Sequence, residues 1–263
     1  VITSATTTVT ATLQGAGAAL GGTASVAAVN GVATFTDLSL TGTAGTYALA
    51  FAAGGLSGVT SGNIALTAGA ATTIAASAGD GQSATVNAAV ATPPAVLVTD
   101  QSGNPVSGVS VTFAVASGGG SVTGASATTN ASGIAAVGSW TLGTTVGANT
   151  LTATSGSLTG SPVTFGATAT AAAASRLALT TAPSASATNG VALAQQPVAR
   201  VEDAFGNPIS QAGTLVTVTA SGGGVLAAGA TATTNASGVA SFSGLVLNGL
   251  AGTYTMTFSA TGL

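Results

Sequence analysis

Apolar and polar residues alternate along most of this chain, with Val or Leu separated by Thr or Ser. Alternation with a period of two is typical of β-strands that bury one face. Short clusters of Gly, Asn, Pro and Ser interrupt it, as expected for turns between strands. No window holds the roughly 20 consecutive apolar residues that a membrane-spanning helix needs, and the best helix candidate, 171–174, is one turn long. The pattern predicts an all-β protein without a membrane-spanning segment.

The alternating pattern also repeats. The sequence ATTNASG occurs at 127–133 and again at 232–238, and a third, diverged copy aligns from Asn30 (NGVATFTDLSL). Successive copies lie about 100 residues apart, which is the size of an immunoglobulin-type sandwich. We therefore predict tandem immunoglobulin-like β-sandwich modules. Their predicted bounds are 1–70 for a module without its first strands, 71–170 for a complete module, and 171–263 for a module without its last strand.

Bulky residues recur at matching positions in the copies, which predicts the buried face of each module. The matched sets are Phe35, Val137 and Phe242; Leu38, Trp140 and Leu245; Leu40, Leu142 and Leu247. The numbering changes from odd to even between the first and second sets, which predicts a bulge or a turn in that strand. After a loop, alternate residues again share one face. These are Tyr47, Leu49 and Phe51, matched by Tyr254, Met256 and Phe258.

Trp140 is the only tryptophan, and a single exposed indole would suit stacking on a sugar. Its repeat equivalents are Leu38 and Leu245, which have no ring. We therefore favour burial of Trp140 in the core, where its indole N–H would need a hydrogen-bond partner.

Two segments, VTDQSGNPVSG from Val98 and VEDAFGNPISQ from Val201, match each other. Gly and Asn tolerate positive φ and Pro ends a ladder, so we interpret Gly-Asn-Pro as a turn and not as a ligand site. Asn130 and Asn235 begin Asn-Ala-Ser sequons, which we likewise interpret as turns rather than as glycosylation sites. The glycine runs 118–120 and 222–224 are not phosphate-binding loops, because neither is followed by Lys-Ser or Lys-Thr.

The chain has few charged residues and few side chains that could take part in catalysis. Only 3% of residues are charged, the net charge is −3, and Lys, His and Cys are absent. A charge this small does not attract nucleic acid or anionic lipid. Without His, Cys or Lys, the chain offers few groups for acid–base or nucleophilic catalysis. The remaining candidates are Asp37, Asp80, Asp100, Glu202, Asp203, Arg176 and Arg200.

Among these candidates, Asp100 and Asp203 take equivalent places before the Gly-Asn-Pro turns. A carboxylate at such a place can accept hydrogen bonds from the N–H groups of the turn. Calcium is the alternative, but it needs several oxygen ligands, usually from more than one carboxylate. Only Glu202 and Asp203 are adjacent, and neighbours on a strand point to opposite faces. We therefore predict a structural role, and no catalytic, cofactor or metal site.

Residues 80–154 closely resemble the bacterial immunoglobulin-like repeat of the invasin and intimin type, in the phrases VLVTDQSGNPVSGVSVTFAVASGGGSV and TTNASGIAAVGSWTLGTTVGANTLTAT. Residues 177–258 and 1–66 resemble more diverged members of the same group. The resemblance implies sandwich modules on a bacterial surface, in adhesin stalks and extracellular fibres, without catalytic residues. In invasin-like adhesins, receptor binding belongs largely to a terminal lectin-like domain with a disulfide. This chain has no cysteine and no segment that departs from the repeat.

Two functions follow as hypotheses. The leading one is a structural repeat segment of a bacterial extracellular filament or adhesin stalk, located outside the cell or on its surface. The alternative is an adhesive module that binds a glycan or a host protein through exposed loops. Edge strands without Lys are poorly protected against pairing, so the low charge favours association into a filament. The expected partners are neighbouring copies of the chain or adjacent modules of a longer chain, with a glycan or surface receptor in the alternative.

The ends of the chain do not coincide with the ends of modules. Residues 1–2 match the pattern that follows Gly-Asn-Pro elsewhere, and Leu263 matches Leu56, after which the first module continues. We therefore expect the first module to lack about two strands and the third to lack its last. Two explanations stay open: a window on a longer array, or a subunit whose gaps neighbouring chains fill by strand addition.

Overall fold

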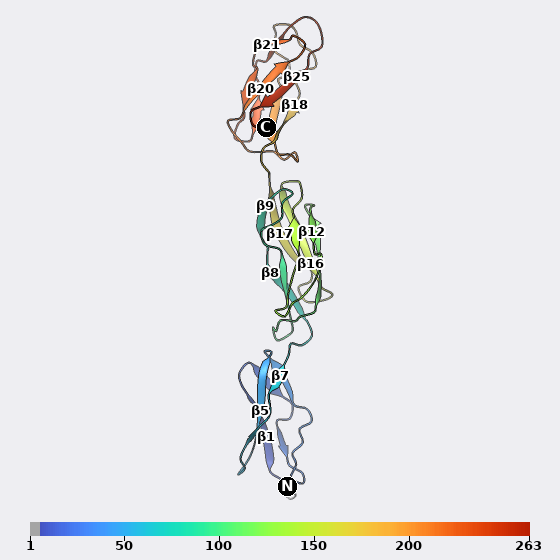
Figure 1. Cartoon of the computed structure of the whole chain (residues 1–263), viewed down its shortest axis with the longest axis vertical. Helices are drawn as coiled ribbons and strands as arrows, with labels where there is room; N and C mark the ends of the chain where they lie inside the picture. Colours follow the sequence, from blue (N-terminus) through green and yellow to red (C-terminus); the bar gives the residue numbers. More distant parts are fainter. Residues whose placement is uncertain (1–5) are drawn as a thin grey trace.

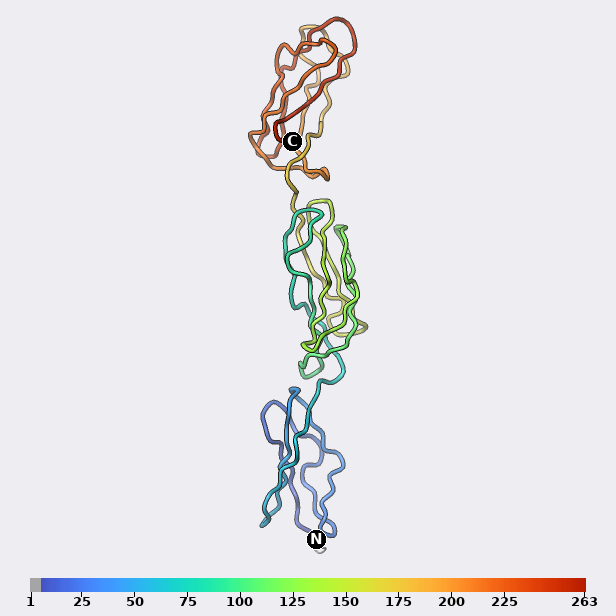
Figure 2. The backbone as a smooth tube through the Cα atoms, viewed as in Figure 1, coloured from blue at the N-terminus to red at the C-terminus, as the bar shows by residue number. Residues whose placement is uncertain are grey.

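The computed structural model describes residues 6–263, so the expectation for residues 1–2 lies outside the described residues. Figure 1 shows three groups of β-strands that follow one another along a single long axis. In Figure 2, a single connecting segment of the backbone joins each group to the next. Residues 6–263 form strands and turns, with no helix long and apolar enough to cross a membrane.

The middle group is a sandwich of two sheets. The larger sheet contains, in order, β13 (Ser126–Thr128), β11 (Ser110–Ser117), β16 (Gly147–Thr154), β17 (Val163–Thr170) and β9 (Gln82–Thr85). The smaller sheet contains β14 (Ile134–Ala136), β10 (Ala95–Thr99) and β8 (Thr73–Ala78). A short ribbon pairs β12 (Ser121–Thr123) with β15 (Ser139–Thr141). These pairings are antiparallel except for the parallel pair of β17 with β9.

The core of the middle group lies between its sheets. Alternate residues of β17 point inward, so that Val163, Phe165, Ala167 and Ala169 are buried while the residues between them are not. Trp140 is fully buried in the same core, which confirms the interpretation from its Leu equivalents. Its indole Nε1 has no hydrogen-bond partner within residues 6–263, so the expected partner is not found.

The odd-to-even change in the repeat, for which we expected a bulge or a turn, coincides with a break between two strands at Val137 and Gly138 and not with a bulge inside one strand. β14 pairs with β10 in the smaller sheet, whereas β15 pairs with β12. The chain therefore crosses from one sheet to another at Val137 and Gly138. Each side chain still points into the shared core, but from a different sheet.

The third group repeats this plan with fewer strands. One sheet contains β18 (Arg176–Thr181), β19 (Val198–Glu202) and β23 (Val239–Ser241), and the other contains β22 (Thr231–Thr233), β20 (Leu215–Ala220) and β25 (Met256–Ala260). A ribbon pairs β21 (Val225–Ala228) with β24 (Val246–Asn248). Within residues 171–263 nothing pairs with the outer edge of β25, where β17 covers β16 in the middle group.

The first group has one main sheet. It contains β3 (Ser25–Ala27), β1 (Thr8–Gln14), β5 (Gly45–Ala53) and β6 (Val59–Thr60), with β7 (Ile64–Leu66) also paired to β5. A ribbon pairs β2 (Ala18–Gly21) with β4 (Ser39–Gly42). Residues 6–70 contain no counterpart of the sheet formed by β14, β10 and β8.

Burial of the matched bulky residues follows the number of strands in each group. Phe242 is buried, whereas its equivalent Phe35 is only half-buried because no second sheet covers it. Tyr254 is half-buried, which is less than the core position that the sequence predicted, since β25 has an open edge. The predicted fold class, tandem immunoglobulin-like β-sandwiches, is confirmed.

Candidate functional site: the junctions between modules

At the first junction, the turn after β10 is organised by Asp100. Its Oδ1 accepts hydrogen bonds from the backbone N–H groups of Ser102 (2.9 Å) and Asn104 (2.8 Å), and its own N–H donates to the Asn104 carbonyl (2.9 Å). Gly103 supplies the positive φ of +82° that the turn needs. The prediction that Asp100 accepts turn N–H groups is therefore confirmed.

The Asn104 side chain extends from its own module to the preceding one. Its Oδ1 accepts a hydrogen bond from the Ala44 N–H (2.7 Å), and its Nδ2 donates to the Gly42 carbonyl (2.9 Å). Residues 42–44 join β4 to β5 in the preceding group of strands. The amide thus pairs with this loop in the way that one strand's backbone pairs with another.

Asp100 also holds the linker between the two groups. Its Oδ2 accepts the Nδ2–H of Asn104 (2.9 Å) and the backbone N–H of Gly69 (2.8 Å). Asp100 and Asn104 are both nearly fully buried. Four segments are therefore joined by two side chains: strand end, turn, linker and the preceding module's loop.

The second junction repeats each of these bonds. Asn207 accepts from the Val146 N–H (3.0 Å) and donates to the Thr144 carbonyl (2.8 Å), while Asp203 accepts from Asn207 Nδ2 (2.8 Å) and from the linker N–H of Ala172 (3.1 Å). Asp203 Oδ1 also accepts the backbone N–H groups of residues 205 and 207 (2.9 Å each). We call each set, Asp100 with Asn104 and Asp203 with Asn207, a junction clamp.

The environment keeps both aspartates ionised. The Asn104 side chain, followed by the Gly69 N–H, lowers the pKa of Asp100 to about 2. Burial raises the pKa of Asp203, but hydrogen bonds from the side chain and backbone of Asn207 and from Ala172 and Phe205 outweigh it and hold that pKa below its usual value.

The other charged candidates make contacts of the same structural kind. Glu202 is buried and binds Arg200 (2.5 Å) and Arg176 (2.8 Å), and Arg200 is the first cause that lowers its pKa. Asp37 accepts hydrogen bonds from the N–H and hydroxyl of Thr23, which lower its pKa.

Asp80 accepts the N–H groups of Gly81 and Gly166. Within residues 6–263 no three His, Cys, Asp or Glu residues gather where a metal ion could bind. Glu202 and Asp203 bind different partners, so the adjacent pair does not converge on one site.

The contacts that Asn104 and Asn207 make with the preceding module were not predicted, because the sequence indicated only a turn at each of these positions. Asn130 and Asn235 behave as the sequence predicted: each side-chain Oδ1 accepts two backbone N–H groups of its own turn. One signal could have separated the two kinds of asparagine. Asn104 and Asn207 each follow Asp by four residues, so the Asp already satisfies the turn and leaves the amide free.

No family model and no curated protein matches the sequence. Three solved structures to which this chain is similar are all bacterial. The FdeC adhesin of Escherichia coli has a TM-score of 0.47 and 18% identity, with 97% of this chain and 81% of FdeC covered. Invasin, described as a bacterial integrin-binding protein, has a TM-score of 0.42 and 19% identity, with 98% and 51% covered. InvD of Yersinia pseudotuberculosis has a TM-score of 0.39 and 17% identity, with 97% and 73% covered.

This chain therefore spans about half the length of the invasin chain. The proteins found are of the group that the sequence resemblance named, the bacterial immunoglobulin-like adhesin domains. The chain is an all-β array of immunoglobulin-like sandwich modules, similar in structure to bacterial adhesins.

Proposed function

We propose that this chain is a stiff spacer, a structural repeat segment of a bacterial extracellular filament or adhesin stalk without catalytic activity. Its modules are residues 1–70, 71–170 and 171–263. The observation that carries the proposal is the junction clamp, which is present with the same atoms at both junctions.

A clamp of this kind resists bending. Modules joined by a flexible linker move relative to one another unless an interface holds them. The Asn amide makes two directional bonds to the preceding module, and each bond contributes about 0.5–1.5 kcal/mol net. The bond from the linker N–H to Asp100 fixes the chain on the other side of the hinge. Bending must therefore break several bonds together.

The surface and partners of the chain belong to the same proposal. The modules stand on or outside a bacterial cell, in contact with adjacent modules of a longer chain or with neighbouring copies. The exposed positions of strands such as β11 and β17 hold Ser, Thr and Ala, and only 3% of the residues of the chain are charged. This composition suits a spacer, because charged or aromatic side chains would be expected on a face built for one receptor.

The test compares Asn104, which binds the preceding module, with Asn130, which binds only its own turn. Asn104→Asp keeps the shape but removes the Nδ2–H that donates to Gly42, and it places a carboxylate against Asp100. In Asn130→Asp, the control, a carboxylate can still accept the two turn N–H groups that Asn130 accepts. Because the chain has no cysteine, spin labels can be attached through cysteines introduced at the exposed Thr46 and Thr112, one in each module.

Pulsed electron paramagnetic resonance then measures the distribution of distances between the labels. We expect a narrow distribution in the parent and in Asn130→Asp, and one at least about twice as wide in Asn104→Asp, because the hinge loses its bonds. Equal widths in all three proteins would show that the clamp does not stiffen the junction, and the spacer proposal would lose its support.

A further inference from the structure

The sheet formed by β18, β19 and β23 in the third module carries the only two cationic side chains of the chain on its outer face. Arg176 on β18 and Arg200 on β19 both bind the carboxylate of Glu202, which is nearly fully buried. Ala199 and Val201, which alternate with these β19 residues, are buried on the inner face. The two arginine side chains are 52% and 33% exposed. Two positive charges and one negative charge leave this cluster with a net positive charge, on a chain whose net charge is −3.

Glu202 holds both guanidinium groups in place and leaves most of their donors free. Nε and Nη2 of Arg176 donate to Oε2 of the carboxylate (3.2 and 2.8 Å), and the same two atoms of Arg200 donate to Oε1. A guanidinium group has about five N–H donors, so more than half of them stay available on each arginine. Because one buried carboxylate orients both groups before any ligand binds, the entropy cost of binding is reduced.

An exposed aromatic ring belongs to the same surface. Phe205, in the turn after β19, is 44% exposed, and within residues 6–263 it is the one aromatic residue among the exposed large apolar side chains. Nη2 of Arg176 lies against this turn, 2.7 Å from the place that a Cβ atom on Gly206 would take. The ring and the guanidinium groups therefore stand at one end of the pair of strands. We call this set the Arg–Phe patch: Arg176, Arg200, Glu202 and Phe205.

The fold does not require the residues of this patch. In the middle module, which forms the same strand pair and the same clamp, all four positions hold residues that are neither charged nor aromatic. They are Thr73, Leu97, Thr99 and Ser102, in place of Arg176, Arg200, Glu202 and Phe205. The hydroxyls of Thr73 and Thr99 are 2.6 Å apart, so the two strands pair there without ions. The patch is therefore an addition that the third module carries on a shared framework.

We propose that the Arg–Phe patch binds an acidic sugar unit of a polysaccharide. The carboxylate of a uronic acid would accept charge-assisted N–H bonds from the guanidinium groups. The C–H bonds on one face of the sugar ring would lie on Phe205, because the face of an aromatic ring carries partial negative charge. A single exposed ion pair is weak, but a polysaccharide presents many acidic units to many copies of the chain at once.

Two observations favour an acidic sugar over other acidic partners. In a second copy of this chain, the exposed carboxylates of Asp37 and Asp80 already accept hydrogen bonds within their own modules. An acidic peptide or a phosphate group would use the guanidinium groups but would leave the exposed ring of Phe205 without a role. The inference does not use the junction clamps, so it is independent of the spacer proposal.

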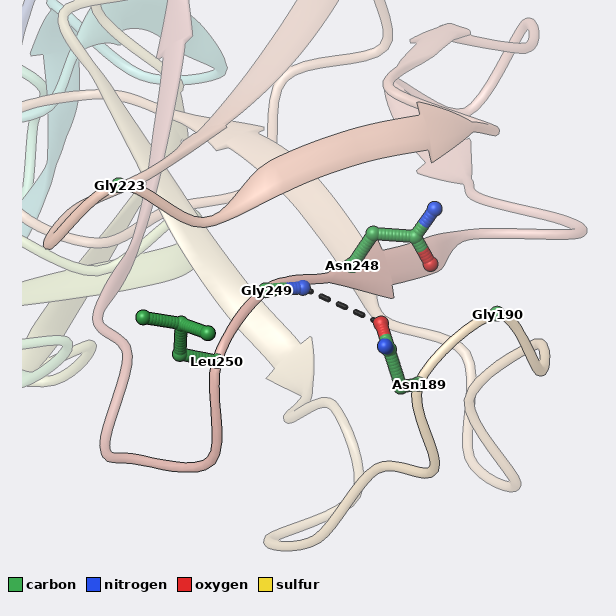
Figure 3. Close-up of a pocket in the computed structure, with 6 residues that line it drawn as sticks. All are labelled: Asn189, Gly190, Gly223, Asn248, Gly249 and Leu250. Atoms are coloured by element: carbon green, nitrogen blue, oxygen red, sulfur yellow. Dashed lines mark hydrogen bonds between the residues drawn. The ribbon is translucent and has the colours of Figure 1, made fainter.

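The hollow shown in Figure 3 supplies a reference within the same module. Asn189 accepts the Gly249 N–H there (3.1 Å), and the lining of the hollow holds no charged side chain. Residues 249–251 align with the loops 42–44 and 144–146, which contact the module after their own, whereas the turn that carries Phe205 contacts the module before it. The hollow and the patch therefore lie at opposite ends of the module. An acidic sugar held by the patch should leave the Gly249 N–H signal unchanged.

Nuclear magnetic resonance of the full chain tests the proposal. The chain has two arginines, so its ¹H–¹⁵N spectrum contains two Arg Nε–H signals, which are followed together with the backbone N–H of Gly206. Tri-galacturonate is added at low salt, in parallel with the neutral galactotriose and with tri-glutamate. We expect saturable shifts with tri-galacturonate at a concentration at least about threefold lower than tri-glutamate needs, and none with galactotriose. The shifts should decrease as added salt screens the charges.

Two variants restore the residues of the middle module, where they are compatible with folding. Phe205→Ser should weaken the binding of tri-galacturonate about threefold and leave that of tri-glutamate unchanged. Arg176→Thr combined with Arg200→Leu and Glu202→Thr should weaken it at least about tenfold, measured on the backbone N–H of Gly206.

Leu215→Ser is the matched control, because it removes an exposed apolar side chain from the other sheet of the same module. It should bind tri-galacturonate as the parent does. The proposal is wrong if tri-galacturonate gives no saturable shift, if galactotriose binds as well, or if Phe205→Ser binds like the control. Binding of tri-glutamate as tight as that of tri-galacturonate would make an acidic peptide the ligand and would equally overturn it. None of these results changes the clamps, so the proposed function stands or fails separately.

Discussion

The turn by itself would accept many residue types at positions 104 and 207. The contact with the preceding module is what requires Asn there. The turn's N–H groups are satisfied by Asp100 and Asp203, so the turn itself makes no demand on the amide. The neighbouring loop offers one carbonyl and one N–H, and the amide of Asn or Gln carries a donor and an acceptor side by side on one planar group that matches them. The short Asn side chain fits the turn, and the longer Gln would overshoot it.

At the residue scale the pKa shifts predict how stability depends on pH. The folded-state pKa of Asp100 is about 2, below the ordinary 3.8, and those of Asp203 and Glu202 are shifted in the same direction. Lowered values stabilise the folded state above the unfolded-state pKa, and this stabilisation is lost as pH falls through the folded-state pKa. We expect a flat melting temperature from about pH 4 to 9, where no His or Cys titrates, and a decrease between about pH 4 and 2.

Thermal denaturation followed by circular dichroism across this range measures the effect. Asp100→Asn and Asp203→Asn should flatten the acid limb, since they remove the titrating groups that the clamps hold. A midpoint of stability loss near neutral pH would contradict this explanation.

At the element scale the sequence was informative about strands and less so about their partners. The alternation of Val163 to Thr170 predicts a half-buried strand, and β17 is one. Residues 185–188 align with β9 but form no strand, because β9 pairs only with β17 and the third module has no counterpart of it. The crossing at Val137 and Gly138 was also out of reach, since it depends on which sheet each flanking segment joins. Pairing is decided by segments far away in sequence, which local pattern does not encode.

The aromatic pairs between elements predict a difference between equivalent positions. Phe242 and Phe258 pack edge to face with ring centres 5.4 Å apart, and Phe35 and Phe51 are also 5.4 Å apart. Phe242→Ala should lower the free energy of unfolding of its module by about 3–5 kcal/mol, as for a large buried aromatic. Phe35→Ala should cost less, because its ring is already half-exposed.

Urea denaturation of each variant, with hydrogen exchange to assign the transition to a module, measures these costs. The control is Thr231→Ala on the exposed face of β22, which should change little. The repeat pattern placed Tyr254 on a buried face, but its side chain is partly exposed, so Tyr254→Ala should cost less than Phe242→Ala. Equal losses for Phe242 and Phe35 would mean that a second sheet adds nothing to burial of this position.

At the scale of the whole molecule, two like clamps impose one relation between neighbouring modules. The atoms involved are the same at both junctions, so each step along the chain should repeat the same displacement and rotation. Tandem repetition was visible in the sequence through ATTNASG and Gly-Asn-Pro. The orientation of the modules was not, because it depends on side chains that reach across a boundary.

Small-angle X-ray scattering of the chain in solution tests this relation most directly. The unmodified protein should give the distance distribution of a straight rod of three modules laid end to end (Figure 2). Asn104→Asp combined with Asn207→Asp should give a smaller radius of gyration and a shorter maximum dimension, whereas Asn130→Asp combined with Asn235→Asp should match the parent. A parent whose scattering already fits freely jointed modules, or a clamp variant that scatters like the parent, would contradict the claim that these two asparagines hold the modules in line.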